Sequence, residues 1–236
     1  MINQIKNNCT NHSKITVLIF FFISVVNSIE AQFNTEIGYT MSYMSAKSFN
    51  SLIDAYNLKQ PMIKEMKNLN YIGGFNAGIT FKTGAVKYGL FWESQTSKKT
   101  GTEGTLISSE PAKEKKLYFY FNSVSGGLAA AGKHFGLGTT VDYNFFRVKT
   151  NKTGVSNKID VIKNDYFSSK IYTIIYFKVN QKVGIEFKPY FRIPWKGIDL
   201  DPLSLYLDAG DAQKSKFSDL MQFGLSFNIL NGKQGD

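Results

Sequence analysis

Side chains able to perform catalysis are scarce in this sequence. The chain of 236 residues contains two histidines, His12 and His134. A hydrolase needs a histidine held between a nucleophile and an acid. His12 lies in a stretch that we expect to be cleaved off, and His134 falls in a short turn, at the end opposite to the long connections. We therefore predict that the protein is not an enzyme and that it has no catalytic residues.

Candidate ligands for metals and cofactors are equally few. The connection at residues 194–217 contains four aspartates, Asp199, Asp201, Asp208 and Asp211. Their oxygens are suitable for calcium, but the spacing matches no EF-hand loop, and solvated loop acids are the favoured interpretation. Gly132-Lys133 lacks the flanking residues of a phosphate-binding loop. The sequence thus predicts no bound metal and no cofactor.

Six charged residues occupy positions of a kind otherwise held mostly by Gly, Asn, Ser and Thr. They are Glu36, Lys87, Glu93, Glu186, Lys188 and Arg192. Each stands in a stretch where large apolar residues alternate with small or polar ones, which places all six on the polar face of a sheet. Because an isolated buried charge is costly, we expect them to form a polar network by pairing with one another. Two roles stay open: filling the interior of a barrel, or providing a path for protons or ions.

The strands that position these charges are predicted from period-2 alternation. It is clearest at residues 221–229, where Met, Phe, Leu, Phe and Ile alternate with Gln, Gly, Ser and Asn. The eight predicted strands are residues 33–43, 69–82, 85–95, 117–130, 135–148, 166–179, 183–193 and 221–229. Their connections are alternately long and short, as in up-and-down barrels of outer membranes. We predict an all-β fold, an eight-stranded antiparallel up-and-down transmembrane β-barrel.

Alternation alone does not say which face of the strands points outward. The narrow interior of an eight-stranded barrel suits small residues and a few paired charges. Large apolar residues in mid-strand, with Tyr and Trp nearer the ends, suit contact with lipid. This indicates a membrane barrel; the alternative is a soluble, lipocalin-like barrel with its apolar face inside.

The chain begins with the features of a secretory leader. Lys6 and Lys14 precede the apolar residues 15–26, and Ala31 is a small residue suitable for the position before a cleavage site. The apolar run is short for a transmembrane helix. The single cysteine, Cys9, lies in this leader. The expected organisation is a signal peptide at residues 1–31, the barrel at residues 32–230 and a polar tail at residues 231–236.

One connection is predicted to contain a helix. In residues 48–56 the apolar side chains of Phe49, Leu52, Ile53 and Tyr56 have the i, i+3, i+4, i+7 spacing of an amphipathic helix. Such a stripe can cover the mouth of the barrel or dock a partner protein, and both interpretations stay open.

The net charge of +10 bears on partners. A basic chain often binds nucleic acid, but a secreted chain has little access to it, so no nucleic-acid partner is expected. An anionic lipopolysaccharide leaflet is a more suitable surface, and solvated loop charge is the simplest interpretation.

Several segments resemble outer-membrane β-barrel proteins of the Bacteroidota. They are the leader ending in Ala-Gln, the strand Phe-Asn-Thr-Glu-Ile-Gly-Tyr, the strand Gly-Gly-Phe-Asn-Ala-Gly-Ile and the closing Phe-Gly-Leu-Ser-Phe. In shape these proteins are similar to small barrels of the outer membrane protein A and X type. The chain departs from the pattern after Phe227, because Asn-Ile-Leu and a polar tail follow where such barrels often end on an aromatic residue.

The resemblance implies a location in the bacterial outer membrane, with membrane lipid, lipopolysaccharide and possible protein partners such as another outer-membrane protein or a surface lipoprotein. The function predicted is that of a non-enzymatic surface, structural or complex-forming protein acting through its external loops. The alternative is a pore for small solutes or ions.

Overall fold

The computed structural model describes residues 32–104, 112–151, 158–210 and 219–232. The expected signal peptide and residues 233–236 of the expected tail lie outside this range. No helix among the described residues has the length and apolar character needed to cross a membrane.

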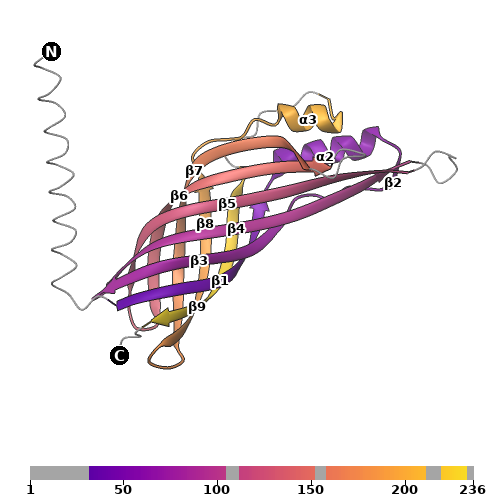
Figure 1. Ribbon diagram of the computed structural model, residues 1–236. Coiled ribbons are helices and arrows are strands. Elements are labelled where there is room, and N and C mark those ends of the chain that lie inside the picture. Colours follow the sequence, from indigo (N-terminus) through magenta and orange to yellow (C-terminus); the bar gives the residue numbers. More distant parts are fainter. Residues whose placement is uncertain (1–31, 105–111, 152–157, 211–218, 233–236) are drawn as a thin grey trace, which may run out of the picture.

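Eight long antiparallel strands form a closed barrel (Figure 1). They are β1 (Gln32–Ser45), β3 (Tyr71–Thr83), β4 (Val86–Glu103), β5 (Lys113–Ala131), β6 (Phe135–Asn151), β7 (Lys158–Lys178), β8 (Val183–Pro194) and β9 (Met221–Gly232). Each strand pairs with its neighbours in sequence, and β1 pairs with β9 to complete the closure. The predicted fold class is confirmed. The last strand continues to Gly232, two residues beyond the expected barrel boundary, because Asn34 and Thr35 of β1 still pair with Gly232 and Asn231.

The two faces of the barrel wall differ sharply in polarity. On β1, the outward-facing Ile37 and Met41 are 68% and 57% exposed, whereas the inward-facing Glu36 and Thr40 are 3% and 0% exposed. Aromatic pairs such as Tyr39–Phe75 and Tyr43–Tyr71 extend this outward apolar surface across β1 and β3. A contiguous apolar surface of this size is unfavourable in water and suits the hydrocarbon of a membrane. The orientation of the faces is the one predicted from the sequence.

Three strands are much longer than the sequence suggested. β4, β5 and β7 contain 18, 19 and 21 residues. The sequence suggested polar connections at residues 96–116 and 149–165, but most of the described residues in these two ranges belong to strands. Lysine, threonine and glycine obscured this part of the alternation. Figure 1 shows β4, β5, β6 and β7 continuing past the end of the barrel wall toward the helices.

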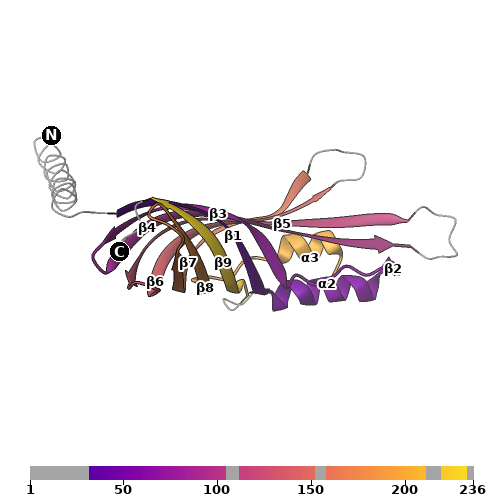
Figure 2. The same cartoon turned by 90° about the horizontal axis from the view of Figure 1, so that it is seen from below.

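These extensions form a lobe together with α2 (Lys47–Lys59), β2 (Met62–Lys64) and α3 (Asp201–Leu207). Both helices lie on the same side of the extended strands (Figure 2). The sequence predicted α2 over residues 48–56, but it indicated neither β2 nor α3. α3 is a single short stretch with Pro202 in its first turn, and such a helix forms mainly because it packs on something else.

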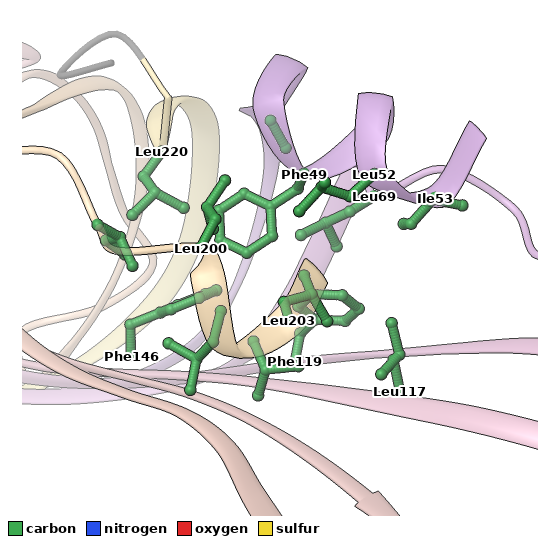
Figure 3. Close-up of a cluster of buried hydrophobic side chains, with 14 of the residues drawn as sticks. Phe49, Leu52, Ile53, Leu69, Leu117, Phe119, Phe146, Leu200, Leu203 and Leu220 are labelled. Atoms are coloured by element: carbon green, nitrogen blue, oxygen red, sulfur yellow. The ribbon is translucent and has the colours of Figure 1, made fainter. Parts of the chain in front are cut away.

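An apolar cluster fills the space between the helices and the strands of the lobe. Phe49 of α2 makes edge-on ring contacts with Phe119 of β5 and Phe146 of β6, with ring centres 6.3 and 5.7 Å apart. Leu203 of α3 is also fully buried in this cluster (Figure 3). The segment after α2 is attached by Asn50, whose Oδ1 accepts the Leu69 N–H at 2.8 Å.

The inward face of the sheet therefore changes character along single strands. On β5, Ser125 and Ser123 face the barrel interior, and the next inward residues, Phe121, Phe119 and Leu117, face the apolar cluster. On β6 the same change occurs between Asn144 and Phe146. The level of this change marks the boundary between barrel and lobe.

We predict that Phe49→Ala destabilises the lobe and leaves the barrel closed. Loss of a buried phenylalanine costs about 3–5 kcal/mol. Phe49 belongs to the apolar cluster, whereas the ion pairs inside the barrel do not involve it. Limited proteolysis should cut the lobe of the variant faster than that of the unmodified protein, while heat-modifiable migration on gels, a measure of barrel closure, stays the same. Leu58→Ala is the matched control, because Leu58 is on the same helix but 88% exposed; equal protease resistance of both variants would contradict the prediction.

Candidate functional site

The charged interior of the barrel is the candidate site. The six charged residues predicted from the sequence all lie inside the barrel, each with 7% exposure or less. They come from three strands: Glu36 from β1, Lys87 and Glu93 from β4, and the remaining three from β8. On β8, Glu186, Lys188 and Arg192 share a face because side chains two residues apart point the same way along a strand.

Four of these charges form a neutral group near the short turns, here called the turn-side quartet. It consists of Glu36, Lys87, Glu186 and Lys188. Lys188 Nζ lies 2.9 and 2.7 Å from the two carboxylate oxygens of Glu36 and 2.9 Å from Glu186 Oε2. Lys87 Nζ donates to Glu186 Oε1 at 2.5 Å. Two cations and two carboxylates thus compensate one another.

A second neutral group lies closer to the lobe and is called the lobe-side quartet. It consists of Glu93, Asp142, Lys170 and Arg192. Arg192 Nη2 donates to Glu93 Oε2 at 2.6 Å, and Arg192 Nε donates to Asp142 Oδ2 at 2.8 Å. Lys170 Nζ donates to Glu93 Oε2 at 3.3 Å. The guanidinium also stands 4.7 Å from the ring centre of Phe121, where the apolar cluster of the lobe begins.

Amide and hydroxyl groups connect the lobe-side quartet to the barrel wall. Arg192 Nη1 donates to Gln222 Oε1 at 2.6 Å, and Gln95 Nε2 donates to Glu93 Oε1 at 2.5 Å. Gln95 in turn accepts a hydrogen bond from Ser42 at 3.1 Å and donates to the Tyr190 hydroxyl at 3.1 Å. Charges fixed by this many partners are held in single positions, which suits a packed interior.

Sequence reasoning missed two members of the lobe-side quartet, Asp142 and Lys170. Asp142 is fully buried, and it also accepts a hydrogen bond from Thr140. The signal was present, because Asp142 and Lys170 have the inward parity of their strands, opposite to Val141 and Ile171. Strand parity alone therefore places both side chains on the inward face.

The remaining candidates from the sequence lie elsewhere. Phe49, Leu52, Ile53 and Tyr56 of α2 are at most 5% exposed and belong to the apolar cluster, so a partner could reach them only by displacing the helix. The Tyr56 hydroxyl donates to Glu103 at 2.8 Å, and burial, followed by this hydrogen bond, raises the pKa of Tyr56. His134 is exposed in the β5–β6 turn.

The aspartates of the β8–β9 connection do not converge on one point. Asp208 pairs with Lys59 at 2.8 Å, and this hydrogen bond lowers the pKa of Asp208. Asp199 Oδ1 accepts the Asp201 N–H at 3.0 Å. Asp211 lies outside the described residues. Within the described part of the chain, no three His, Cys, Asp or Glu side chains are grouped so as to hold a metal ion.

Comparisons with known proteins give structural similarity only. Neither a protein-family model nor a curated protein matches the chain. Among solved structures, the attachment invasion locus protein Ail of Yersinia pestis is similar with a TM-score of 0.44 and 12% identity, over 87% of this chain and 100% of that one. The Neisserial surface protein A, NspA, gives a TM-score of 0.37 at 8% identity, over 85% and 96% of the two chains. The outer membrane protease OmpT from Escherichia coli gives 0.35 at 11% identity, with the same coverage.

The fold is a closed, eight-stranded, antiparallel up-and-down β-barrel of the membrane-spanning kind. This conclusion rests on the chain's own strand pairing and on its apolar outer surface.

We predict that Arg192→Met strongly destabilises the barrel. The substitution leaves Glu93 and Asp142 buried with one cation, Lys170, between them, and breaking a buried ion pair in this way costs about 3–5 kcal/mol. Urea unfolding in lipid vesicles, followed by tryptophan fluorescence, measures the loss.

Arg147→Met is the matched control, because Arg147 is the only other arginine of the chain. It pairs with Asp165 at 2.6 Å, but that carboxylate is 35% exposed. A partly exposed pair contributes about 1 kcal/mol or less. Equal losses in the two variants would show that the lobe-side quartet has no special importance for stability.

Proposed function

We propose that this protein is a non-enzymatic outer-membrane protein whose barrel serves as a closed anchor and whose lobe makes the functional contacts. The observation that carries the proposal is the filling of the interior. Two neutral quartets with their hydrogen-bonded partners cross the barrel, and the apolar cluster covers its end at the lobe. A barrel filled in this way holds its lobe in place and offers no evident passage for solutes.

The same geometry supports a non-enzymatic role. Each charged side chain of the two quartets is engaged by a partner of opposite charge, so none is presented to a substrate. His134, the histidine of the described chain, lies on an exposed turn at the end away from the lobe. A general base needs a positioned partner and a protected site, and this turn supplies neither.

The orientation of the barrel follows from the connections. The β3–β4, β5–β6 and β7–β8 turns are short, and the lobe occupies the opposite end (Figure 1). In barrels of outer membranes the short turns face the periplasm and the long connections face outward. The lobe is therefore assigned to the cell surface, and the resemblance of several strands to Bacteroidota barrels is part of this proposal.

The strands of the lobe present a face of lysine and tyrosine on the side away from the helices. Lys158 Nζ stands 4.0 Å from the ring centre of Tyr118 and donates to the Tyr120 hydroxyl at 2.6 Å. Lys98 lies 5.7 Å from the same Tyr118 ring. These residues continue the lipid-facing side of β4, β5 and β7 upward, so they reach the level of the outer-leaflet head groups. Lipopolysaccharide phosphates are the partners proposed for this face.

A protein partner would meet other residues. The apolar stripe predicted for α2 faces inward, whereas Leu58 of α2 and Leu205 of α3 are 88% and 83% exposed. Contact with another outer-membrane protein or a surface lipoprotein is proposed to use these leucines and not Phe49, Leu52, Ile53 or Tyr56.

We predict that the purified protein produces no steady conductance in planar lipid bilayers, because side chains with fixed partners occupy the interior. The folded fraction is checked in the same preparation by heat-modifiable migration. Stable, stepwise open channels would overturn the closed-anchor function and favour the alternative of a small-solute or ion pore.

We also predict that replacing Lys98 and Lys158 together by glutamine reduces the lipopolysaccharide that co-purifies with the protein. A lysine near an anionic membrane surface contributes about 1 kcal/mol, so two should change the affinity by roughly tenfold or more. The control is Lys47→Gln with Lys59→Gln, which removes the same charge from α2 on the other side of the lobe. Equal losses in the two double variants would contradict a specific role for the lysine and tyrosine face.

A further inference from the structure

The turn end of the barrel contains a cavity that the proposed function does not use. It opens between the ends of β3, β4, β7 and the β5–β6 turn, below the turn-side quartet. The charged and imidazole side chains lining it are Lys82, Lys87, Lys133, His134, Lys178 and Glu186. Five of these six are basic residue types. The two quartets of the barrel interior, in contrast, contain equal numbers of cationic and anionic side chains.

Strand register explains why lysines point into this cavity. Lys82 and Lys87 are paired across the β3–β4 turn, and both have the inward parity of their strands. Lys178 has the inward parity of β7, two residues after Tyr176 and four after the buried Ile174. Three lysines from three strand ends are thereby directed toward one space.

Backbone hydrogen bonds place the β5–β6 turn at the rim of the cavity. The His134 carbonyl accepts the Tyr176 N–H at 2.8 Å, which connects the turn to β7. The Gly132 N–H donates to the Phe135 carbonyl at 2.8 Å, and the Ala131 N–H donates to the Ala85 carbonyl at 2.7 Å. Lys133 and His134 are thus held beside the cavity by main-chain contacts that do not depend on their own side chains.

Two of the lysines that line the cavity lack an acidic partner among the described residues. Glu186 is the one carboxylate among the described lining residues, and it is shared by Lys87 at 2.5 Å and Lys188 at 2.9 Å within the neutral turn-side quartet. Lys82 and Lys133 have no ion-pair partner within the described residues. The ammonium groups of Lys82 and Lys133 are therefore available to an anion.

We propose that this cavity is a binding site for a small oxyanion, with a phosphate group as the ligand that fits its charge. A phosphate group carries about −1.5 to −2 charges at pH 7 and accepts several charge-assisted hydrogen bonds. Lys82, at the end of β3, and Lys133, in the β5–β6 turn, supply ammonium donors, and His134 adds a ring N–H. The site faces the proposed periplasmic side, where the ligand can be free phosphate or the phosphate monoester of a lipid head group in the inner leaflet.

The inference does not depend on the proposed function of the lobe. A closed barrel with no lipopolysaccharide contact could still bind an anion at its turn end, and a barrel that conducts could lack the site.

The test is isothermal titration calorimetry of the purified protein in nonionic detergent with inorganic phosphate, at constant ionic strength maintained with chloride. The expected result is saturable binding of one phosphate per chain. Lys82→Gln combined with Lys133→Gln should lower the affinity about tenfold or more, because two charge-assisted hydrogen bonds are lost. The matched control, Lys47→Gln with Lys163→Gln, removes the same charge from exposed positions of the lobe and should bind like the unmodified protein.

Two further measurements separate loss of the site from loss of folding and identify the source of the phosphate group. Lys82→Arg with Lys133→Arg retains both charges and should retain binding, which separates loss of the site from loss of folding. Glycerol 3-phosphate distinguishes the sources, since equal binding supports a head-group monoester and selective binding of inorganic phosphate supports the free ion. Absence of saturable phosphate binding, or the same weakening in the lobe control, would overturn the proposal.

Discussion

The structure depends on one constraint, which is that a sheet surrounded by lipid must close. Unpaired backbone groups are too costly in hydrocarbon, so the eight strands pair around a complete circle. Closure with eight strands leaves an interior only wide enough for side chains. The inward residues must then fill this space and balance their charges, and the two neutral quartets satisfy both demands. Removing one member is costly because its partners cannot reach bulk water.

Both faces of the long strands change at the boundary of the membrane. On β5 the inward face passes from Ser123 to Phe121, while the outward face passes from Val124 to Tyr120. Inside the membrane the outer surface is apolar and the interior polar; in the lobe the interior is apolar and the outer surface carries lysine and tyrosine. One continuous sheet thus contacts lipid in the barrel and water in the lobe. The lobe is a small water-facing unit built on the extensions of the barrel strands.

This arrangement couples the lobe to the barrel mechanically. β4 to β7 are shared by both parts, and Arg192 at the top of the barrel contacts Phe121 at the base of the apolar cluster. A lobe mounted on such strands keeps its position relative to the membrane surface. That is a useful property for a protein whose proposed contacts are with head groups.

Strand parity, a local property, was determined by the sequence alone. It was sufficient to predict eight strands and to place the six charges on one face, because alternation of apolar and polar residues depends only on neighbours along the chain. The alternating lengths of the connections predicted the up-and-down order, and the small residues beside the charges indicated that their face points inward. The tertiary structure decided the rest. Lys98 and Lys149 lie in strands that pass for loops in the sequence, and α3 is too short to be predicted without the cluster on which it packs. Asp142 pairs with Arg192 and Lys170 pairs with Glu93 across the barrel. A pairing between distant strands is fixed only when closure brings them within reach of one another.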